Sequence, residues 1–498
     1  MEGFKLNWHQ PDGKSFVTSN VCCLRIINFE PATSVTYAIV KIVGSVETND
    51  QNPECTSAPN CVTITSSSRH DVKADLVNGR FKVFLELNRG ENSICITHCD
   101  QNVQLKVTYE PNLTDYTVIP LYVICDGHDG RFQAPENEKN DVDSALRRIT
   151  LCAKLLQCFT AEKLHDNGLG RKTFSLKGGC SVFRSKLDYT EARKMGQEEL
   201  WGRIGREIMQ SEIGFHAAKY LAFLSCTTYV GEKFTSFLKS HEDLIGITDG
   251  YVALGGGGLA LFGTACLYTW PEYFDEVAAR FEDNALVDRT AFLDDSCYRG
   301  TIGGCFSTTL GSVLHELYHT FDLGHTEVGV MARGFDNIYK FFTTDEKTAS
   351  SDVSKGFQHQ IQFKEEFEAS KLSERLEKAN KKKEFRVIRK FDAGDDTFLT
   401  KSCAVILSYH KWFQSSIPEQ PYTLFYDPSN RFIKSTAGIR VVELRRQYDE
   451  MVRFSWTFEG KVLKYSFQIP EQALDETLAI LFVEDKYSNI FKKAVNFV

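Results

Sequence analysis

The stretch STTLGSVLHELYHTFDLGHTEVGVM, residues 307–331, decides how the rest of the chain is interpreted. It places His315 and His319 four positions apart around Glu316, in an H-E-x-x-H pattern, and His325 follows six residues later. Side chains four residues apart lie on the same face of an α-helix. Two imidazoles at this spacing can therefore bind one zinc ion, with each nitrogen about 2.0–2.1 Å from the metal.

The apolar residues of this stretch favour a helix. At about 100° per residue, four of them fall opposite the two histidines, so that one face can be buried while the other faces a cleft. These residues are Leu310, Val313, Leu317 and Phe321. Gly324 is placed to end the helix, because glycine adopts the left-handed conformation of a C-terminal cap at little cost. The chain can then fold back and bring His325 to the same metal ion.

Two alternatives to this three-histidine site remain open. A pair of ordinary helix histidines would give the same H-E-x-x-H pattern, although a third histidine at a defined position argues against chance. The third ligand could also be Asp322 or Glu327, because carboxylates serve as ligands in catalytic zinc sites.

H-E-x-x-H followed by a histidine ten residues after the first resembles the metzincin clan of zinc peptidases. Metzincins also place a methionine in a tight turn beneath the metal, and Met331 in the sequence GVMA is similar to that Met-turn. The chain departs from the clan at Asp322, where glycine is usual, and Gly324 comes two residues later. The resemblance implies one zinc ion per chain, with Glu316 as the catalytic base. The ligands that it implies are His315, His319 and His325.

The chain also resembles a eukaryotic family of predicted zinc metallopeptidases. The stretches that carry this resemblance are GGGGLALFG (255–263), LYTWP (267–271), DDSCYR (294–299), LHELYHTF (314–321), GHTEVGVMARGFD (324–336) and CAVILSYHKWF (403–413). They cover the middle of the chain well and its two ends loosely. The resemblance implies a zinc metalloendopeptidase acting on a peptide or protein substrate, without identifying that substrate.

Composition limits the class of protein. A chain of 498 residues with 42% hydrophobic and 25% charged residues is typical of a globular protein with two or three domains. The net charge of −8 and the lack of a large basic block argue against nucleic acid as a partner. The sequence contains no run of about 18 apolar residues, so it predicts no membrane span. The N-terminus lacks the apolar core of a secretory signal. We therefore expect a cytoplasmic protein whose 15 cysteines are reduced.

The pattern along the chain predicts an α+β fold with a metzincin-like catalytic domain between two β-sandwiches. Residues 1–115 carry short strand-like runs and the turn Asn78-Gly79, which favours a hairpin. Residues 116–415 begin with a buried strand, 118–125, and a long helix, 141–165, which is typical of an α/β catalytic domain. Residues 416–498 again read as short strands, and both terminal domains could bind protein partners.

Four further features of the middle domain need an interpretation. Gly255–Gly258 is predicted to be a loop leading into an edge strand near the active helix, where an extended peptide could pair, with an ordinary strand of the sheet as the alternative. Asp294 and Asp295 are interpreted as part of a solvated loop rather than as hydrogen-bonding partners of the metal ligands or a calcium site. The charge-rich segment 358–389 predicts a solvated helix or a partly mobile insertion. His410 is a secondary candidate for stabilising an oxyanion, with core or surface placement as the alternative.

The chemistry follows from a zinc ion held by neutral imidazoles. Such a metal lowers the pKa of a bound water toward about 7, and Glu316 could take the proton from that water and pass it to the leaving amine. A different hypothesis is a catalytically inactive scaffold that binds proteins, and a third is a zinc hydrolase acting on a substrate other than a peptide. Glu316 argues against the scaffold, because a structural zinc site needs no base.

Overall fold

The computed structural model describes residues 22–47, 60–66, 69–238, 240–343, 397–415, 422–473 and 478–496. The charge-rich segment 358–389 lies outside the described residues. The structure mixes helices with several sheets, as the α+β prediction requires. The described residues of Met1–Thr33, Ile42–Val83 and Ser93–Lys106 form one compact unit, and those of Ser34–Lys41, Phe84–Asn92 and Val107–Val498 form a second. All residues of the candidate site lie in the second unit.

The first strands of the chain form a three-stranded sheet in the order β1-β3-β6 and a five-stranded sheet in the order β2-β8-β7-β4-β5. Their bounds are β1 Cys23–Ile26, β2 Ala32–Val35, β3 Ile39–Glu47, β4 Cys61–Ser66, β5 Arg69–Asp75, β6 Arg80–Glu86, β7 Gly90–His98 and β8 Gln101–Tyr109. The predicted turn is present, since Asn78 and Gly79 both have positive φ, 51° and 69°. The strands on either side of it, β5 and β6, belong to different sheets.

The cysteines differ from the expectation at one position. Thirteen described cysteines are free thiols, but Cys22 is disulfide-bonded. Cys22 also lies near His98 and Cys99, in a group with the spacing of metal ligands. A sulfur engaged in a disulfide is a poor metal ligand because metals bind the thiolate. We therefore do not consider this group a metal site.

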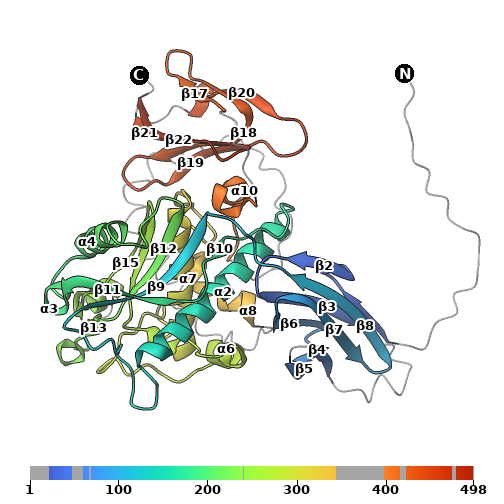
Figure 1. Cartoon of the computed structure of the whole chain (residues 1–498), viewed down its shortest axis with the longest axis vertical. Helices are drawn as coiled ribbons and strands as arrows, with labels where there is room; N and C mark the ends of the chain where they lie inside the picture. Colours follow the sequence, from blue (N-terminus) through green and yellow to red (C-terminus); the bar gives the residue numbers. More distant parts are fainter. Residues whose placement is uncertain are drawn as a thin grey trace, which may run out of the picture. The chain divides into compact units, whose positions relative to one another are not determined.

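The region that contains the H-E-x-x-H pattern is built on a six-stranded sheet in the order β10-β9-β12-β16-β15, with β11 also pairing with β9 (Figure 1). Its strands are β9 Thr117–Asp126, β10 Ser175–Leu176, β11 Ser181–Asp188, β12 Ala218–Leu224, β15 Ala253–Gly256 and β16 Leu259–Gly263. All pairings are parallel except that of β15 with β16. The predicted buried strand is β9, and its continuous apolar run is typical of a parallel strand covered on both faces. A separate two-stranded ribbon joins β13 Thr228–Tyr229 and β14 Thr248–Asp249.

Helices cover both faces of this sheet. On one face, Leu200, Ile204 and Ile208 of α4 form a core with alternate residues of β9, β12 and β16. The opposite face contacts α2 and α7, which are joined by a hydrogen bond of 2.9 Å between Thr160 and Tyr318. The helix bounds are α2 Val142–Asp166, α3 Tyr189–Ala192, α4 Gln197–Met209, α5 His241–Gly246, α6 Val277–Phe281, α7 Ile302–Thr320, α8 Tyr339–Phe342 and α10 Lys401–Tyr409.

The helix α7 contains the H-E-x-x-H pattern, as predicted. It begins after Thr301, whose side chain accepts a hydrogen bond from the backbone of Gly304. Its end differs from the prediction, because the left-handed residue is Asp322, with φ 64°, and not Gly324. Aspartate is among the few residues that adopt this conformation at moderate cost. Gly324 is needed for a different reason, since a Cβ there would lie 2.5 Å from the carbonyl oxygen of Glu450.

The glycine run also differs in detail from its prediction. Gly255 and Gly256 end strand β15, and Gly257, with φ 52°, forms the turn into β16. The edge strand of the sheet is therefore β15, which precedes the turn, and β16 lies inside the sheet. A Cβ on Gly255 would lie 1.9 Å from the carbonyl oxygen of Glu316. Glycine at this position allows the edge strand to approach α7 closely.

The described strands after residue 421 form one six-stranded antiparallel sheet, and not the two separate sheets expected of a sandwich. Their bounds are β17 Leu424–Asp427, β18 Phe432–Arg446, β19 Val452–Thr457, β20 Lys464–Gln468, β21 Leu478–Asp485 and β22 Ile490–Asn496. The long strand β18 pairs with four others because its first residues pair with β17 and β20 and its later residues pair with β19 and β21. The helix α10 contacts β18, β19 and β21. The domain boundaries near residues 115 and 415 stay predictions.

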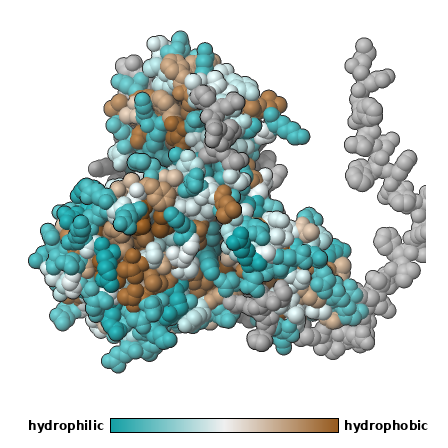
Figure 2. All heavy atoms as spheres, in the orientation of Figure 1, coloured by the Kyte–Doolittle hydropathy of each residue, from teal (hydrophilic) through white to brown (hydrophobic). Residues whose placement is uncertain are grey.

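Hydrophilic residues cover most of the face shown in Figure 2, with smaller hydrophobic groups between them. Within the residues that the structure describes, no helix combines the length and the apolar character needed to cross a membrane.

We predict that Gly311→Ala lowers the free energy of unfolding by about 2 kcal/mol or more, because overpacking displaces backbone. A Cβ at this position of α7 would lie 2.0 Å from the carbonyl oxygen of Phe335. Gly202→Ala in α4 is the matched control, since its Cβ would meet only the end of the Arg206 side chain at 3.4 Å. In the control the free energy of unfolding should rise by up to about 1 kcal/mol, because alanine has a higher helix propensity than glycine. Urea unfolding of both variants measures the difference, and equal midpoints would contradict the tight packing of α7.

Candidate metal centre

The structure brings together the three histidines expected to bind metal. His315, His319 and His325 each offer a ligand nitrogen, and these nitrogens lie within 4.8 Å of one another. The Nε2 atoms of His315 and His319 are 3.1 Å apart. Two ligands of a tetrahedral zinc ion, each about 2.05 Å from the metal, would be about 3.3 Å apart. The spacing of the helix histidines therefore fits a zinc ion.

The first two histidines are oriented by backbone carbonyls. Nδ1 of His315 lies 2.8 Å from the oxygen of Val330, and Nδ1 of His319 lies 2.8 Å from the oxygen of Leu323. A carbonyl oxygen can only accept, so both Nδ1 atoms carry the proton. Each Nε2 is thus left with a free electron pair. Two such acceptors cannot hydrogen-bond to each other at 3.1 Å, and a cation between them would satisfy both.

Burial keeps these two imidazoles neutral. It lowers the pKa of His315 to about 4 and the pKa of His319 to about 3. The neighbouring histidines lower both values further, because a second positive charge would lie close by. A neutral imidazole is the form that binds metal, so the site is ready for a cation at neutral pH.

The third histidine is held by the C-terminal sheet. Nδ1 of His325 lies 2.6 Å from the carbonyl oxygen of Asp449, which lies between β18 and β19. The backbone N–H of Val452, at the start of β19, donates to the carbonyl oxygen of His325 at 2.9 Å. The same turn therefore fixes both the ring and the backbone of this histidine. As in the first two, the contact leaves Nε2 free to bind metal.

A buried ionic network fastens the end of α7 to the same sheet. Arg445 of β18 is fully buried, and its guanidinium donates to the carbonyl oxygen of Asp322 at 2.8 Å. Its charge is balanced by Glu443 at 2.7 Å and Glu450 at 3.0 Å. Lys492 of β22 also contacts Glu450, at 2.8 Å. A buried arginine is costly unless all its partners are in place, so the contact between Arg445 and Asp322 favours one position of the end of α7.

Glu316 lies beside the histidines and contacts the edge strand. Its Oε2 accepts a hydrogen bond of 2.7 Å from the backbone N–H of Gly255. Burial raises the pKa of the Glu316 carboxyl to about 7, while the Gly255 N–H opposes this shift. A carboxyl group with a pKa near neutrality can both accept and release a proton.

The residue proposed for the Met-turn lies next to the cluster. Met331 is buried, and its carbonyl oxygen accepts from the N–H of Thr326 at 3.0 Å. The turn is tight, because the N–H of Ala332 donates to the carbonyl of Gly329 at 3.0 Å. Val330, in the same turn, is the partner of His315. The turn therefore contacts the candidate metal ligands through its backbone.

The alternative ligands lie outside the cluster. The carboxylate of Asp322 faces His410 at 3.7 Å and Lys492 at 3.9 Å, and Glu327 is exposed. His410 is buried, and its ring packs against Trp412 and Phe321. Among the described contacts, none joins His410 to the three histidines. Its surroundings are those of a core histidine.

Sequence reasoning missed the groups that orient the ligands. The carbonyl of Asp449 has no sequence signal, because every residue carries a carbonyl group. Arg445 resembles any other charged residue in a strand. Gly255 did have a signal, since the glycine run stood out, but its contact with Glu316 could not be foreseen.

We predict that His325→Ala lowers zinc affinity by at least about tenfold, because it removes a ligand, whereas Asp322→Gly leaves it nearly unchanged. Glycine suits the φ of 64° at position 322. His315→Ala and His319→Ala should reduce the metal content below the single zinc expected per chain. Metal analysis and chelator competition measure these effects. Loss of zinc in Asp322→Gly with retention in His325→Ala would move the third ligand to Asp322.

We also predict that Asp449→Ala weakens zinc binding by about tenfold, although Asp449 offers no side-chain ligand. Its carboxylate accepts from Arg446 at 3.1 Å and from the N–H of Met451 at 3.0 Å, and so holds the turn that orients His325. Tyr448→Ala is the matched control, because Tyr448 belongs to the same turn and its side chain is 80% exposed. Chelator competition on both variants tests the prediction, which fails if they bind zinc equally well.

Comparisons with known proteins agree with the site. Two relatives carry the name "Putative zinc metalloproteinase", one from Schizosaccharomyces pombe and one from Saccharomyces cerevisiae. Each is 26% identical to this chain, over 301 residues in the first and 321 in the second. The matches cover 55% and 58% of this chain but 47% and 45% of the relatives. The chain thus matches about half the length of these relatives.

A solved structure, the amylomaltase from Corynebacterium glutamicum, matches 25% of this chain and 20% of its own with a TM-score of 0.11 and 9% identity, too little to indicate a common fold. The family model described as "Putative peptidase family" matches residues 23–402. These residues include α7 and all three histidines, but they end before the turn at Asp449. Because the match extends over most of the chain, this protein belongs to that family.

Proposed function

We propose that this chain is a zinc-dependent metalloendopeptidase in which His315, His319 and His325 hold the metal and Glu316 is the general base. The observation that carries the proposal is the position of Glu316, buried between the metal-binding helix and the edge strand. A structural zinc site would gain nothing from this residue, because protein ligands occupy all four coordination positions of a structural zinc ion. A carboxyl group whose pKa burial raises to about 7, one residue from a ligand, is suited to accept a proton and later release it.

The chain's own residues supply the remaining steps. Zinc, when bound, polarises a carbonyl group and acidifies water. Glu316 accepts the proton of the attacking water at its carboxylate and then delivers it to the nitrogen of the leaving amine. The hydrogen bond from Gly255 holds one carboxylate oxygen in place, which leaves the other free to move the proton.

The edge strand supports a peptide as the substrate. Within the described sheet, β15 is the last strand and has β16 on one side only. An extended peptide can add to such an edge through main-chain hydrogen bonds, which hold many sequences alike. Because Gly255 contacts Glu316, a peptide along β15 passes the catalytic carboxyl group. This proximity favours a peptide bond over other substrates.

The likeness to metzincins is part of the same proposal. The three histidines, the Met331 turn and the antiparallel edge strand are arranged around one helix. Asp322 stands where metzincins usually have glycine, and it adopts the left-handed conformation that glycine would supply. The departure in sequence therefore preserves the backbone path to His325.

We predict that Glu316→Gln retains fold and zinc but loses at least about 10²-fold in peptide hydrolysis, the usual effect of removing a general base. Glutamine keeps the size and can still accept from Gly255. Glu327→Gln is the control, because this neighbouring carboxylate is exposed and should leave activity intact. Cleavage of a peptide library, read by mass spectrometry, measures the rates. Equal cleavage by wild type and Glu316→Gln would overturn the mechanism.

A catalytically inactive scaffold would behave differently in the same experiment. Wild type and Glu316→Gln would then retain the same protein partners from a lysate and cleave none of them. A peptidase would release its substrates, and only Glu316→Gln would keep them bound.

A further inference from the structure

A cavity lies beside the candidate catalytic carboxyl group, one helical turn away. Ser312 and Val313 of α7 line it and precede Glu316 by about one turn. On its other side, Ala253 of β15 lies two residues before Gly255, the partner of Glu316. A peptide extended along β15 would therefore place a side chain next to the reacting bond at the mouth of this cavity.

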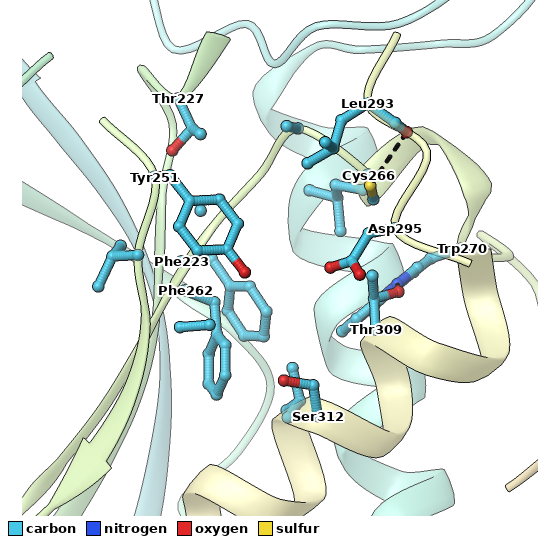
Figure 3. Close-up of a pocket in the computed structure, with 16 residues that line it drawn as sticks. Phe223, Thr227, Tyr251, Phe262, Cys266, Trp270, Leu293, Asp295, Thr309 and Ser312 are labelled. Carbon is cyan, nitrogen blue, oxygen red and sulfur yellow. Dashed lines mark hydrogen bonds between the residues drawn. The ribbon is translucent and has the colours of Figure 1, made fainter. Parts of the chain in front are cut away.

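The cavity contains one carboxylate whose charge is poorly balanced. Figure 3 shows Asp295 pointing into it. The neighbouring acids have fixed cations as partners, since Asp294 accepts from Arg289 at 2.7 Å and Asp336 accepts from Arg333 at 2.9 Å. Among the described residues, Asp295 forms its ion pair with His241, at 3.5 Å, and the guanidinium of Arg333 also favours its charged form from a greater distance.

The expectation of a solvated loop is therefore wrong for both aspartates. The side chain of Asp294 is 1% exposed and that of Asp295 is 17% exposed. Burial raises the pKa of the Asp295 carboxyl, and His241 only partly opposes the shift. A cation entering the cavity would stabilise the charged form of Asp295, which burial disfavours.

Two hydroxyl groups accompany the carboxylate. Tyr251 and Ser312 also line the cavity, and Figure 3 shows the hydroxyl of Tyr251 directed toward Asp295. Within the part of the chain that the structure describes, the side chains of Tyr251, Ser312 and Asp295 make no hydrogen bond by the usual geometric criteria. Three oxygen-bearing groups thus face one space, and of these Asp295 has His241 as a charged neighbour. A lysine ammonium, with three N–H donors, complements such a set.

The walls of the cavity suit the rest of a lysine side chain. Phe223, Phe262 and Trp270 line it, and the space that the centre of a water molecule can reach is about 40 Å³. This volume holds about three waters, which favours a narrow unbranched chain. Methylene groups can pack against the aromatic rings, and the same rings attract a cation. Calcium fits poorly, because it requires six to eight oxygen ligands.

We propose that this cavity is a specificity pocket that selects a lysine side chain next to the scissile bond, with Asp295 binding the ammonium group. The proposal rests on the proposed peptidase function for its biological meaning. The pocket itself can be tested by binding alone, so that the two proposals can fail separately.

The hydrolytic test uses a library of random twelve-residue peptides, with cut sites read by mass spectrometry. We expect lysine to be enriched at a position flanking the cut. A cleaved peptide and its copy with norleucine in place of that lysine should differ in kcat/KM by about 10²-fold. In Asp295→Asn this ratio should fall to near one, whereas Asp288→Asn, which removes an exposed charge elsewhere, should keep it. No lysine preference, or the same ratio in Asp295→Asn, would overturn the proposal.

The binding test requires no hydrolysis. Nα-acetyl-lysine amide should bind about tenfold more tightly than Nα-acetyl-norleucine amide, as followed by the fluorescence of Trp270 in the wall. Tyr251→Phe and Ser312→Ala should each weaken the lysine ligand selectively, which keeps the test valid if Asp295→Asn does not fold. Equal binding of both ligands to wild type would refute the pocket. Selective binding of lysine by a protein that cleaves no peptide would support the pocket and refute the peptidase.

Discussion

Three hydrogen bonds from histidine Nδ1 atoms to backbone carbonyls decide what this site can do. Each bond fixes the tautomer of one ring and directs its Nε2 toward the shared point. The carbonyls belong to three separate segments, namely the helix end at Leu323, the tight turn at Val330 and the sheet turn at Asp449. The geometry of the site therefore depends on tertiary structure well outside the helix that carries the motif.

Burial then acts on the charges of the site in opposite directions. It disfavours the charged form of every group, so histidines become neutral ligands while carboxyl groups become weaker acids. The same low polarity lowers the pKa of His315 and raises the pKa values of Glu316 and Asp295. These residues belong to α7 and to the loop facing it. A site that excludes water in this way strengthens any interaction with a charge brought in by metal or substrate.

The sequence was sufficient to predict features that depend on side-chain identity and short-range spacing. The helix α7, the buried strand β9 and the three histidines follow from periodicity and motif. The helix end was assigned to Gly324 because glycine favours a positive φ, yet the structure places Asp322 there and uses Gly324 for close packing. Backbone contacts such as that of Asp449 leave no mark in sequence. Asp294 and Asp295 look alike in the chain, and only the fold gives one an arginine partner and the other a cavity.

The dependence of His325 on the turn between β18 and β19 has a consequence for the order in which the metal site is assembled. Asp449 follows His325 by 124 residues. A ribosome adding about 5–20 residues per second needs about 6–25 seconds to synthesise that interval. Throughout it, the nascent chain carries the H-E-x-x-H helix without the turn that orients the third histidine. The three-histidine site is therefore complete only after the turn at Asp449 has been synthesised and folded, well after the helix that carries the motif.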